Sequence, residues 1–417
     1  MVVSVVENDK LIVLGTQWGS EGKEHVIQHL LDEGKFDIVA KYQGGLSESP
    51  DTGKKLLPSG INHPNVTNVV GNGCVVDVEE LINELEAAGI DGSDDRVKIS
   101  DRAHMILRIH KVLESAFADK DVETSGTGAA YASRTFRNGV RVGDLMSDFG
   151  VFQNDYKIIN AHLARGLPSG ADEAAELAAL ATIRDSFSEK KLVTDTSFYL
   201  HNAILAGKRV LIESNGSALN DVDHGDYPFT NAASTVAGAA CNGLGISPTV
   251  LRSADVLGVV RAIQTRVGYF NDTGPMPTEQ PLSFTAKLNV EGGIRTGWLD
   301  LFLLRHATIL NGFTALALTD ISVLDNLDQI KVGVGYKVDG KELASPPICP
   351  DEWARVEVEY ATLPGWNADT KNAKSFDEFP QGIKDYIAYI EDYVGVLVKF
   401  VSVDKKAEAV ISRGIEV

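Results

Sequence analysis

Short apolar runs rich in β-branched residues alternate with segments of helical periodicity along most of the chain. The runs are KLIVLG, KFDIVAKYQGG, NVTNVVGNGCVV, KRVLIESNG, GFTALALTDIS and QIKVGVGYKV. Apolar residues recur at helical spacing in residues 171–187, 253–267 and 378–394, which we predict to be scaffold helices. Alternating strands and helices are typical of an α/β fold with a mostly parallel sheet. No repeat or linker interrupts the pattern, so we expect residues 1–417 to form a single domain with insertions.

Composition narrows the class of protein. The formal net charge is −19, which disfavours nucleic-acid binding because phosphate contacts supply most of that affinity. A small anionic ligand is still compatible, since it needs only a local cluster of N–H groups and cations. No membrane span or secretory signal is visible, so we expect a cytoplasmic protein. The three cysteines are widely spaced and give neither a disulfide framework nor a metal-ligand pattern.

The stretch LIVLGTQWGSEGKEHV, residues 11–26, places a glycine-rich loop between a buried-strand pattern and a helix start. Gly15, Gly19 and Gly22 lead to Lys23, and a turn of this kind after a strand favours an anion site. A Walker loop is excluded, because the glycine spacing is too long and Glu24 stands where that motif has a hydroxyl. We expect Glu24 to lie solvated in the first turn of the helix.

GTQWGSEGK resembles the N-terminal signature of the adenylosuccinate synthetase family, and the resemblance extends through nearly the whole chain. The family's order is kept by KYQGG, PSGI, GNGCVV, RVGDL, DVDHGDYPF, STVAGAA, TRVG, RTGWLDL and LPGW. The resemblance implies a homodimer built around a central, mainly parallel sheet flanked by helices, related to the P-loop GTP-binding architecture. Family enzymes use GTP to phosphorylate the 6-oxygen of IMP, and aspartate then displaces the phosphate. Mg²⁺ is implied by the resemblance alone.

Several ligand positions that the resemblance indicates are retained. Lys23 matches the phosphate-loop lysine, and Arg137 matches the arginine that reaches the partner subunit's nucleotide phosphate. The motif around His224 lies beside the nucleotide in the family, so His224 is a candidate catalytic residue, with a structural role equally open. Arg295 is the candidate contact for the amino-acid substrate. The candidates for nucleotide or phosphate binding are Gly19, Gly22, Lys23, Gly126, Thr127, Gly128, Arg137, Asn231 and Ser322.

Other positions depart from the family where the resemblance assigns chemistry. Ser20 replaces the aspartate that takes the proton from N1 of the purine, and a hydroxyl is too weak a base to do this unaided. The loop GGLSESPDTGKKLLPSGI lacks the family's catalytic histidine, and Gly216 replaces the glutamine of E-G-A-Q-G. The aspartate-binding loop reads NVEGGIRTGWLD, which keeps only Arg295 and adds Glu291.

The nucleotide preference implied by the resemblance also changes. Ser322 replaces the aspartate of T-K-x-D that reads guanine. Phage relatives that lack this carboxylate use ATP and act on dGMP, and they can carry a small residue in place of the catalytic aspartate. Ser20 and Ser322 resemble that branch, so we expect ATP to be favoured over GTP.

Two functions stay open. In the first, the chain is a divergent ligase that joins aspartate to C6 of a purine nucleotide with ATP or GTP, and another group acts as the base. Alternatively, it is a catalytically silent homologue that binds a nucleotide or acts as a scaffold. Loss of a positioned acid or base typically costs ~10²–10⁴-fold in rate, and both are replaced here. Side chains of the shortened loop, Glu48, Asp51, Lys54 and Lys55, are candidates for a rebuilt site. A folded protein without a ligand is the third reading.

Overall fold

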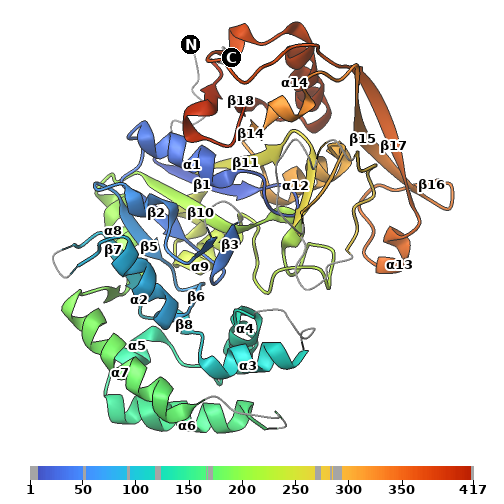
Figure 1. Cartoon of the computed structure of the whole chain (residues 1–417). Helices are drawn as coiled ribbons and strands as arrows, with labels where there is room; N and C mark the ends of the chain where they lie inside the picture. Colours follow the sequence, from blue (N-terminus) through green and yellow to red (C-terminus); the bar gives the residue numbers. More distant parts are fainter. Residues whose placement is uncertain are drawn as a thin grey trace.

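The computed structural model describes residues 8–49, 53–91, 94–117, 124–165, 167, 172–267, 274–281, 284 and 294–414, with the backbone alone for residues 47–49, 53 and 54. Its centre is a ten-stranded sheet whose neighbouring strands are all parallel, except for one antiparallel edge pair (Figure 1). From edge to edge the strands are β19 (Val410–Ser412), β18 (Val398–Ser402), β14 (Ala315–Thr319), β11 (Asp255–Arg261), β1 (Lys10–Gly15), β10 (Val210–Ser217), β2 (Ile38–Lys41), β5 (Thr67–Val70), β7 (Val97–Ser100) and β9 (Val193–Thr194). The predicted α/β fold with a mainly parallel sheet is confirmed.

Helices cover both faces of this sheet. In β1, Leu11 and Val13 join the core under α1, whereas Ile12 and Leu14 join the core on the opposite face. A strand buried on both faces reads as a continuous apolar run, which explains why the pattern of β1 does not alternate. The helix on the first face is α1 (Lys23–Asp32), and those on the second are α8 (Thr196–Leu205), α9 (Ala239–Leu244), α12 (Leu301–Asn311) and α14 (Gln381–Val394).

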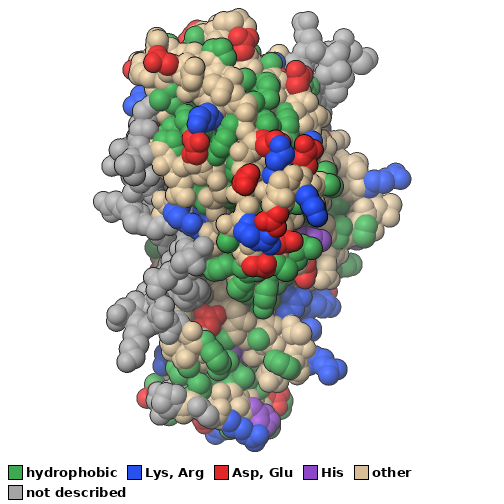
Figure 2. All heavy atoms as spheres, turned by 90° about the vertical axis from the view of Figure 1, so that its right-hand side faces the viewer, with side chains coloured by type: hydrophobic (Ala, Val, Ile, Leu, Met, Phe, Trp, Pro, Cys, Tyr) green, Lys and Arg blue, Asp and Glu red, His purple; other side chains and the backbone are tan. Residues whose placement is uncertain are grey.

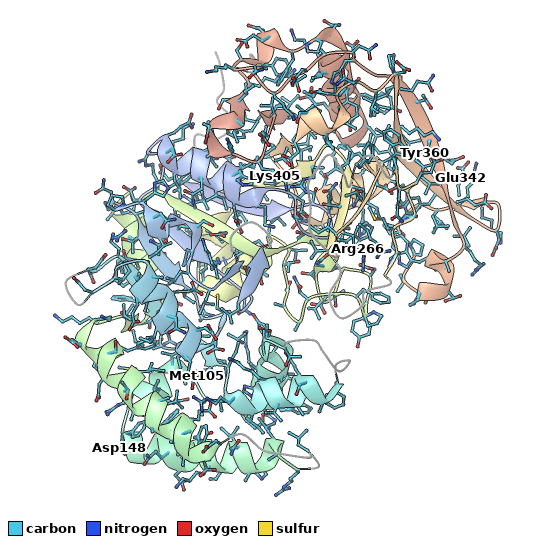
Figure 3. The ribbon with its side chains drawn as sticks, in the orientation of Figure 1. Met105, Asp148, Arg266, Glu342, Tyr360 and Lys405 are labelled. Atoms are coloured by element: carbon cyan, nitrogen blue, oxygen red, sulfur yellow. The ribbon has the colours of Figure 1, made fainter. Side chains whose placement is uncertain are left out.

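A helical lobe with its own apolar core lies at one end of the molecule (Figure 1). Phe152 and Tyr156 of one helix pack there with Leu180 and Phe187 of another. The helices of this region are α2 (Val78–Ala87), α3 (Arg108–Phe117), α4 (Thr127–Phe136), α5 (Val142–Met146), α6 (Phe149–Leu163) and α7 (Glu173–Glu189). The short helices α10 (Pro248–Leu251) and α13 (Pro350–Trp353) lie elsewhere. Met105 and Asp148 mark the lobe in Figure 3.

One predicted helix is wrong. Residues 253–267 form β11 and the short strand β12 (Gln264–Val267) instead. β11 lies between β1 and β14 and is buried on both sides. A β-carbon at Gly258 would lie 3.0 Å from Phe313, so the glycine lets that ring pack on the strand. A fully buried strand has no alternating pattern, and its apolar spacing imitates that of a helix. The other two predictions correspond to α7 and α14.

Smaller sheets extend from the central one. A three-stranded sheet projects to one side of the molecule, where Figure 3 labels Tyr360 and Glu342. The strands of the small sheets are β3 (Ser47–Ser49), β4 (Gly53–Lys55), β6 (Val75–Val76), β8 (His104–Met105), β12, β13 (Ile294–Gly297), β15 (Gln329–Val338), β16 (Lys341–Glu342) and β17 (Val356–Pro364). The 3₁₀ helices are η1 (Ser59–Asn62), η2 (Ala218–Asn220), η3 (Ile321–Leu324), η4 (Phe376–Glu378) and η5 (Ala407–Ala409).

The surface gives no sign of a membrane segment in the described part of the chain. None of its helices is both long and apolar enough to cross a bilayer. On the face shown in Figure 2, acidic and basic side chains lie intermixed, with apolar side chains between them. The net negative charge therefore does not form one continuous acidic patch on this face.

Candidate functional site

The carboxyl ends of the central strands β14, β11, β1 and β10 meet at one edge of the sheet. Gly15 of β1 is paired with Ser217 of β10, and Arg261 of β11 is paired with Thr319 of β14. Ligands of open α/β sheets bind outside this edge. The glycine-rich loop leaves β1 here and runs into α1, so the sequence-predicted anion site lies where such folds place their ligands.

Glycine is required at three positions of this loop. A β-carbon at Gly15 would lie 2.4 Å from both Glu21 Oε2 and Ser217 Oγ, which leaves no room for a side chain. Gly19 and Gly22 have φ values of 96° and 83°, a region that other residues rarely adopt. The loop is therefore fixed in one tight conformation by steric exclusion and by backbone geometry.

Glu21 is fully buried inside the loop. Its Oε1 accepts hydrogen bonds from the backbone N–H groups of Gln17 (3.0 Å) and Gly19 (3.1 Å). Its Oε2 accepts from the Ser217 hydroxyl (2.9 Å) and lies 3.4 Å from Lys23 Nζ. Burial works to raise the pKa of this carboxyl, but Lys23, the Ser217 hydroxyl and the loop N–H groups outweigh it, and the net result is a lowered pKa. A fixed carboxylate thus organises the loop, a role the sequence analysis missed, although an acid between two glycines is its signal.

Ser20 turns its hydroxyl toward a buried guanidinium. Arg261 is 1% exposed, donates from Nη1 to Ser20 Oγ at 3.3 Å, and holds Nε 2.6 Å from Asp320 Oδ2. Ser20 and Asp320 both have left-handed backbone, with φ values of 61° and 55°. Non-glycine residues in such conformations concentrate at functional sites. Because the Ser20 hydroxyl accepts a hydrogen bond from a cation, it is a poor proton acceptor.

Arg261 and Asp320 are functional candidates that sequence reasoning missed. Asp320 is the second residue of TDIS, where the family's T-K-x-D has a lysine, so its charge was the available signal. Its carboxylate is paired with Arg261, and Arg261 in turn contacts Ser20 of the phosphate loop. The two residues come from β11 and from the end of β14, and only the parallel pairing of these strands brings them together.

A second buried ion pair, between Arg266 and Asp226, contacts the loop at Trp18. The Trp18 indole N–H donates to Asp226 Oδ1 at 2.8 Å, and Arg266 Nη1 lies 2.9 Å from Asp226 Oδ2. The guanidinium carbon of Arg266 lies 4.9 Å from the centroid of the Trp18 ring, within cation–π range. Arg266 lies near the middle of the molecule in Figure 3. These contacts tie the loop to the segment DVDHGDYPF.

Three loops converge next to the phosphate loop. A β-carbon at Gly44 would lie 2.4 Å from Asn215 Nδ2, and one at Gly45 would lie 2.5 Å from Thr127 Oγ1. Asn215 Nδ2 donates to the carbonyl of Gly45 at 3.0 Å. The structure therefore brings together the segments KYQGG, ESNGS and TSGTG, which are far apart in the sequence. Thr127 lies at this junction.

The start of α4 already carries a carboxylate. Glu114 accepts from the backbone N–H groups of Gly126 (2.6 Å) and Ala129 (3.0 Å). Gly126 has a φ of 76°, and a β-carbon at Gly128 would lie 3.0 Å from Glu114. Two of the N–H groups at this helix start are thus engaged by the protein itself. Phosphate binding by Gly126, Thr127 and Gly128 stays a prediction.

Gly216 lies against an amide side chain. A β-carbon there would lie 2.7 Å from Asn231 Nδ2 and 2.4 Å from Thr235 Cγ2. The backbone N–H of Asn231 donates to the carbonyl of Asn220, which holds the loop in place. The amide of Asn231 therefore fills the space beside the position where the family has a glutamine, one residue before the Ser217 that binds Glu21.

His224 and Arg137 do not join the phosphate loop. His224 is exposed, and its backbone N–H donates to Asp221 Oδ1 at 3.1 Å. Its ring lies near His306, whose pKa is lowered by burial and, more weakly, by His224. Arg137 is exposed at the end of α4 with a φ of 61°. The site candidate from the DVDHGDYPF segment is Asp226, two residues after His224.

Ser322 and Arg295 lie in different elements, Ser322 in η3 and Arg295 in β13. Ser322 is half-buried in η3, two residues after Asp320. Arg295 in β13 is paired with Arg266 of β12 and donates from Nη2 to the carbonyl of Gly274. Lys55 ends β4 and is half-buried. The side chains of Glu48, Asp51, Lys54 and Glu291 lie outside the described residues.

The described side chains do not fit a magnesium site. Over the described ranges, no group of three or more His, Cys, Asp or Glu side chains is arranged to hold a metal ion. Mg²⁺ is usually held by one or two carboxylates together with substrate phosphates, so what decides the fit is whether a carboxylate beside the loop has an oxygen left for the ion. The described carboxylates beside the loop are engaged: Glu21 by the loop donors and Ser217, Asp226 by Trp18 and Arg266, and Asp320 by Arg261.

A comparison with protein-family models decides the family. The model described as adenylosuccinate synthetase matches residues 12–411. The chain belongs to the adenylosuccinate synthetase family. The resemblance read from the sequence is confirmed, and the site described above is the carboxyl edge of a synthetase-family sheet.

Curated relatives cover the chain almost end to end. An adenylosuccinate synthetase of Caenorhabditis elegans is 39% identical, with 96% of this chain and 93% of the relative aligned. An adenylosuccinate synthetase of Drosophila mojavensis is 37% identical, with 96% of this chain and 93% of the relative aligned. The chain therefore spans nearly the whole length of these two relatives.

Solved structures show the same fold. The fully ligated adenylosuccinate synthetase of Plasmodium falciparum matches with a TM-score of 0.88 at 29% identity, over 97% of this chain and 100% of that chain. The succinoaminodeoxyadenylate synthetase of cyanophage S-2L, bound to dGMP and to dATP as an energy donor, matches with a TM-score of 0.58 at 17% identity, over 96% and 94%. At that lower identity the likeness concerns the fold alone.

Proposed function

We propose that this protein binds a purine nucleotide and the phosphates of a nucleoside triphosphate, and that it does not carry out the family's ligation at the family's rate. Ser20 carries the proposal. It stands where the resemblance places the general base, and its hydroxyl accepts a hydrogen bond from the buried guanidinium of Arg261. A general base must be able to take a proton at working pH. The position that starts the family's reaction therefore holds no proton acceptor.

Binding is supported by the order of the site. The loop from Gly15 to Lys23 is fixed around the Glu21 carboxylate, and it ends in a lysine at the first residue of α1. Backbone N–H groups and a cation after a parallel strand are the elements of a phosphate site. The segments that carry Gly45, Thr127 and Asn215 pack against one another beside the loop. The fold thus keeps a preformed ligand site although reacting groups are replaced.

The triphosphate is ATP in preference to GTP. Ser322 stands where the family's carboxylate reads guanine, and a hydroxyl both donates and accepts hydrogen bonds. A carboxylate only accepts, so it selects a base that presents N–H donors. With Ser322 this selection is absent, and ATP binding is not penalised.

The remaining assignments follow the family. The mononucleotide is a 6-oxopurine nucleotide such as IMP or dGMP. Aspartate binds weakly, because Arg295 alone remains of the family's arginine clamp. The protein is a cytoplasmic homodimer, each chain a single domain, and the exposed Arg137 at the end of α4 faces the nucleotide of the second subunit.

Calorimetric titration followed by phosphate-release assays tests the proposal. Purified protein is titrated with IMP, GMP, dGMP, ATP and GTP, and each pair that binds is assayed for phosphate release with and without aspartate. We expect binding of a mononucleotide and of ATP without aspartate-dependent phosphate release. The absence of binding to all five nucleotides would contradict the binding function, and turnover would contradict the loss of ligation.

Ligation itself is the second candidate function. It is favoured by the curated relatives named adenylosuccinate synthetase, the nearest of those described above at 39% identity. The base would then be water or a group on the substrate, and the small side chain of Ser20 would leave room for a 2-amino group as in dGMP. Aspartate-dependent phosphate release with dGMP and ATP is the result that selects this candidate.

A further inference from the structure

We infer that Arg261 and Lys23 supply the counter-charge for the nucleotide's phosphates at this loop, in place of a magnesium ion. The inference rests on the proposed nucleotide binding and adds to it a claim about charge. Triphosphates bound at phosphate loops usually share their charge with Mg²⁺, which bridges the terminal phosphates. The described residues around Ser20 offer a guanidinium instead of metal ligands.

Arg261 has donors to spare for a ligand. Nε faces Asp320 and Nη1 faces the hydroxyl of Ser20, and the Arg261 side chain makes no other hydrogen bond or ion pair to the described residues. A guanidinium carries five N–H donors in a planar fork that matches phosphate oxygens. The Arg261 side chain is nevertheless buried, with 1% of its surface exposed. A buried guanidinium with unused donors beside a half-buried loop residue points to an anion as its remaining partner.

Asp320 fixes the direction of this guanidinium. Its carboxylate lies 2.6 Å from Nε, the nitrogen nearest the aliphatic stem, and the terminal nitrogen Nη1 donates to Ser20. The left-handed backbone of Asp320, with a φ of 55°, presents the carboxylate to β11. The family's T-K-x-D has a lysine here. An acid at position 320 therefore anchors Arg261 without using its outer donors.

The oxygen atoms a metal would need are engaged. Both oxygens of Glu21 are engaged. Oε1 accepts from two loop N–H groups, and Oε2 accepts from the Ser217 hydroxyl and faces Lys23. Two other side-chain oxygens of the loop are engaged as well, because Thr16 Oγ1 donates to the carbonyl of Val259 and Gln17 Oε1 accepts from the Thr265 hydroxyl. The Ser20 hydroxyl oxygen lies 3.3 Å from Arg261 Nη1. A divalent cation on Ser20 would stand against a guanidinium in a site of low solvent access, where like charges repel strongly.

ATP titrations with and without magnesium test the inference. Wild-type protein is titrated with ATP in excess MgCl₂ and in EDTA. We expect the Kd in EDTA to stay within about threefold of the Kd with magnesium. The decisive variant is the double substitution Arg261→Met and Asp320→Asn, which removes both charges and so leaves no unpaired ion in the interior. Asn tolerates the left-handed backbone at position 320.

The double variant should bind ATP about tenfold more weakly or worse in EDTA, the size expected when a charged hydrogen-bond donor is lost. A matched control is Arg355→Met with Asp339→Asn, an exposed Arg–Asp pair whose aspartate is also left-handed, with a φ of 51°. The control should bind ATP like the wild type in both buffers. Circular dichroism and the unfolding midpoint verify that each variant is folded.

The outcomes separate this inference from the proposed function. ATP binding that disappears in EDTA would overturn the inference and leave nucleotide binding standing. An unchanged affinity of the folded double variant in EDTA would also overturn it, because Arg261 would then not be the counter-charge. No ATP binding in either buffer would overturn the proposed triphosphate binding and the inference with it.

Discussion

Replacing Glu21 by glutamine removes a buried charge while keeping the shape of the side chain. The carboxylate accepts from Gln17 N–H, Gly19 N–H and the Ser217 hydroxyl and faces Lys23 Nζ. In Glu21→Gln the amide oxygen can still accept from the two loop N–H groups, but these bonds are no longer charge-assisted. The amide N–H₂ then faces the Lys23 ammonium, so both groups are donors and that contact is lost.

The cost follows from these contacts. A hydrogen bond to a charged group contributes about 1.5–3 kcal/mol and a neutral one about 1 kcal/mol. Two weakened bonds, a Ser217 hydroxyl that loses its carboxylate acceptor and the lost contact with Lys23 give a loss of about 2–4 kcal/mol in the free energy of unfolding. Glu21→Ala should cost more, about 4–6 kcal/mol, because it leaves two buried N–H groups without an acceptor and also creates a cavity.

Urea denaturation followed by circular dichroism measures the difference as a shift in midpoint at constant m value. Glu86→Gln is the matched control, because Glu86 is exposed on α2, and such a change should stay within about 0.5 kcal/mol of the wild type. If Glu21→Gln were as stable as Glu86→Gln, the negative charge would not be what holds the loop, and the account of the loop given above would be refuted.

Further predictions concern two buried positions, Asp300 and Gly45, and the half-buried Asn231. Burial raises the pKa of Asp300 to about 6, so the stability that its protonated form provides is present below about pH 4 and is lost as the pH rises through 6. Asn does not titrate, so the free energy of unfolding of Asp300→Asn relative to the wild type should rise by up to about 3 kcal/mol between pH 4 and pH 7.5, measured by urea denaturation. Gly45→Ala should weaken IMP binding, because its β-carbon would lie 2.5 Å from Thr127 Oγ1; an unchanged affinity in calorimetry would show that this junction is not part of the site. Asn231→Asp should weaken binding of 6-oxopurine nucleotides about tenfold or more if the amide donates to the ligand, and tighter binding would indicate that the side chain accepts instead.

The sequence predicted those parts of the fold that depend on local pattern. Leu11 to Leu14 and the glycines that follow indicate β1 and its loop, because the run is apolar throughout and the glycines are closely spaced. The pattern failed at β11, whose residues pack on both faces between two other strands. Burial on two sides removes the alternation that identifies a strand, and only the tertiary arrangement restores the distinction.

The site was less accessible from sequence than the fold. Ser20 was identified as the changed base, but its partner Arg261 lies 241 positions away in the chain. The Arg261–Asp320 pair depends on the register between β11 and β14, which no local pattern encodes. His224 was proposed because its motif lies beside the nucleotide in the family, and the structure brings Asp226 of the same motif to the loop through Trp18. Long-range pairing of charges is set by packing, so the residues can be named from sequence but their partners cannot.

The most direct test of the central claim compares this protein with its C. elegans relative under identical conditions. Both proteins are given saturating IMP, aspartate, magnesium and either GTP or ATP, after calorimetry has verified nucleotide binding, and phosphate release is followed. The account predicts aspartate-dependent release by this protein at least ~10²–10⁴-fold below that of the relative, the cost of losing a positioned acid or base. Release at a comparable rate, with either triphosphate, would contradict it.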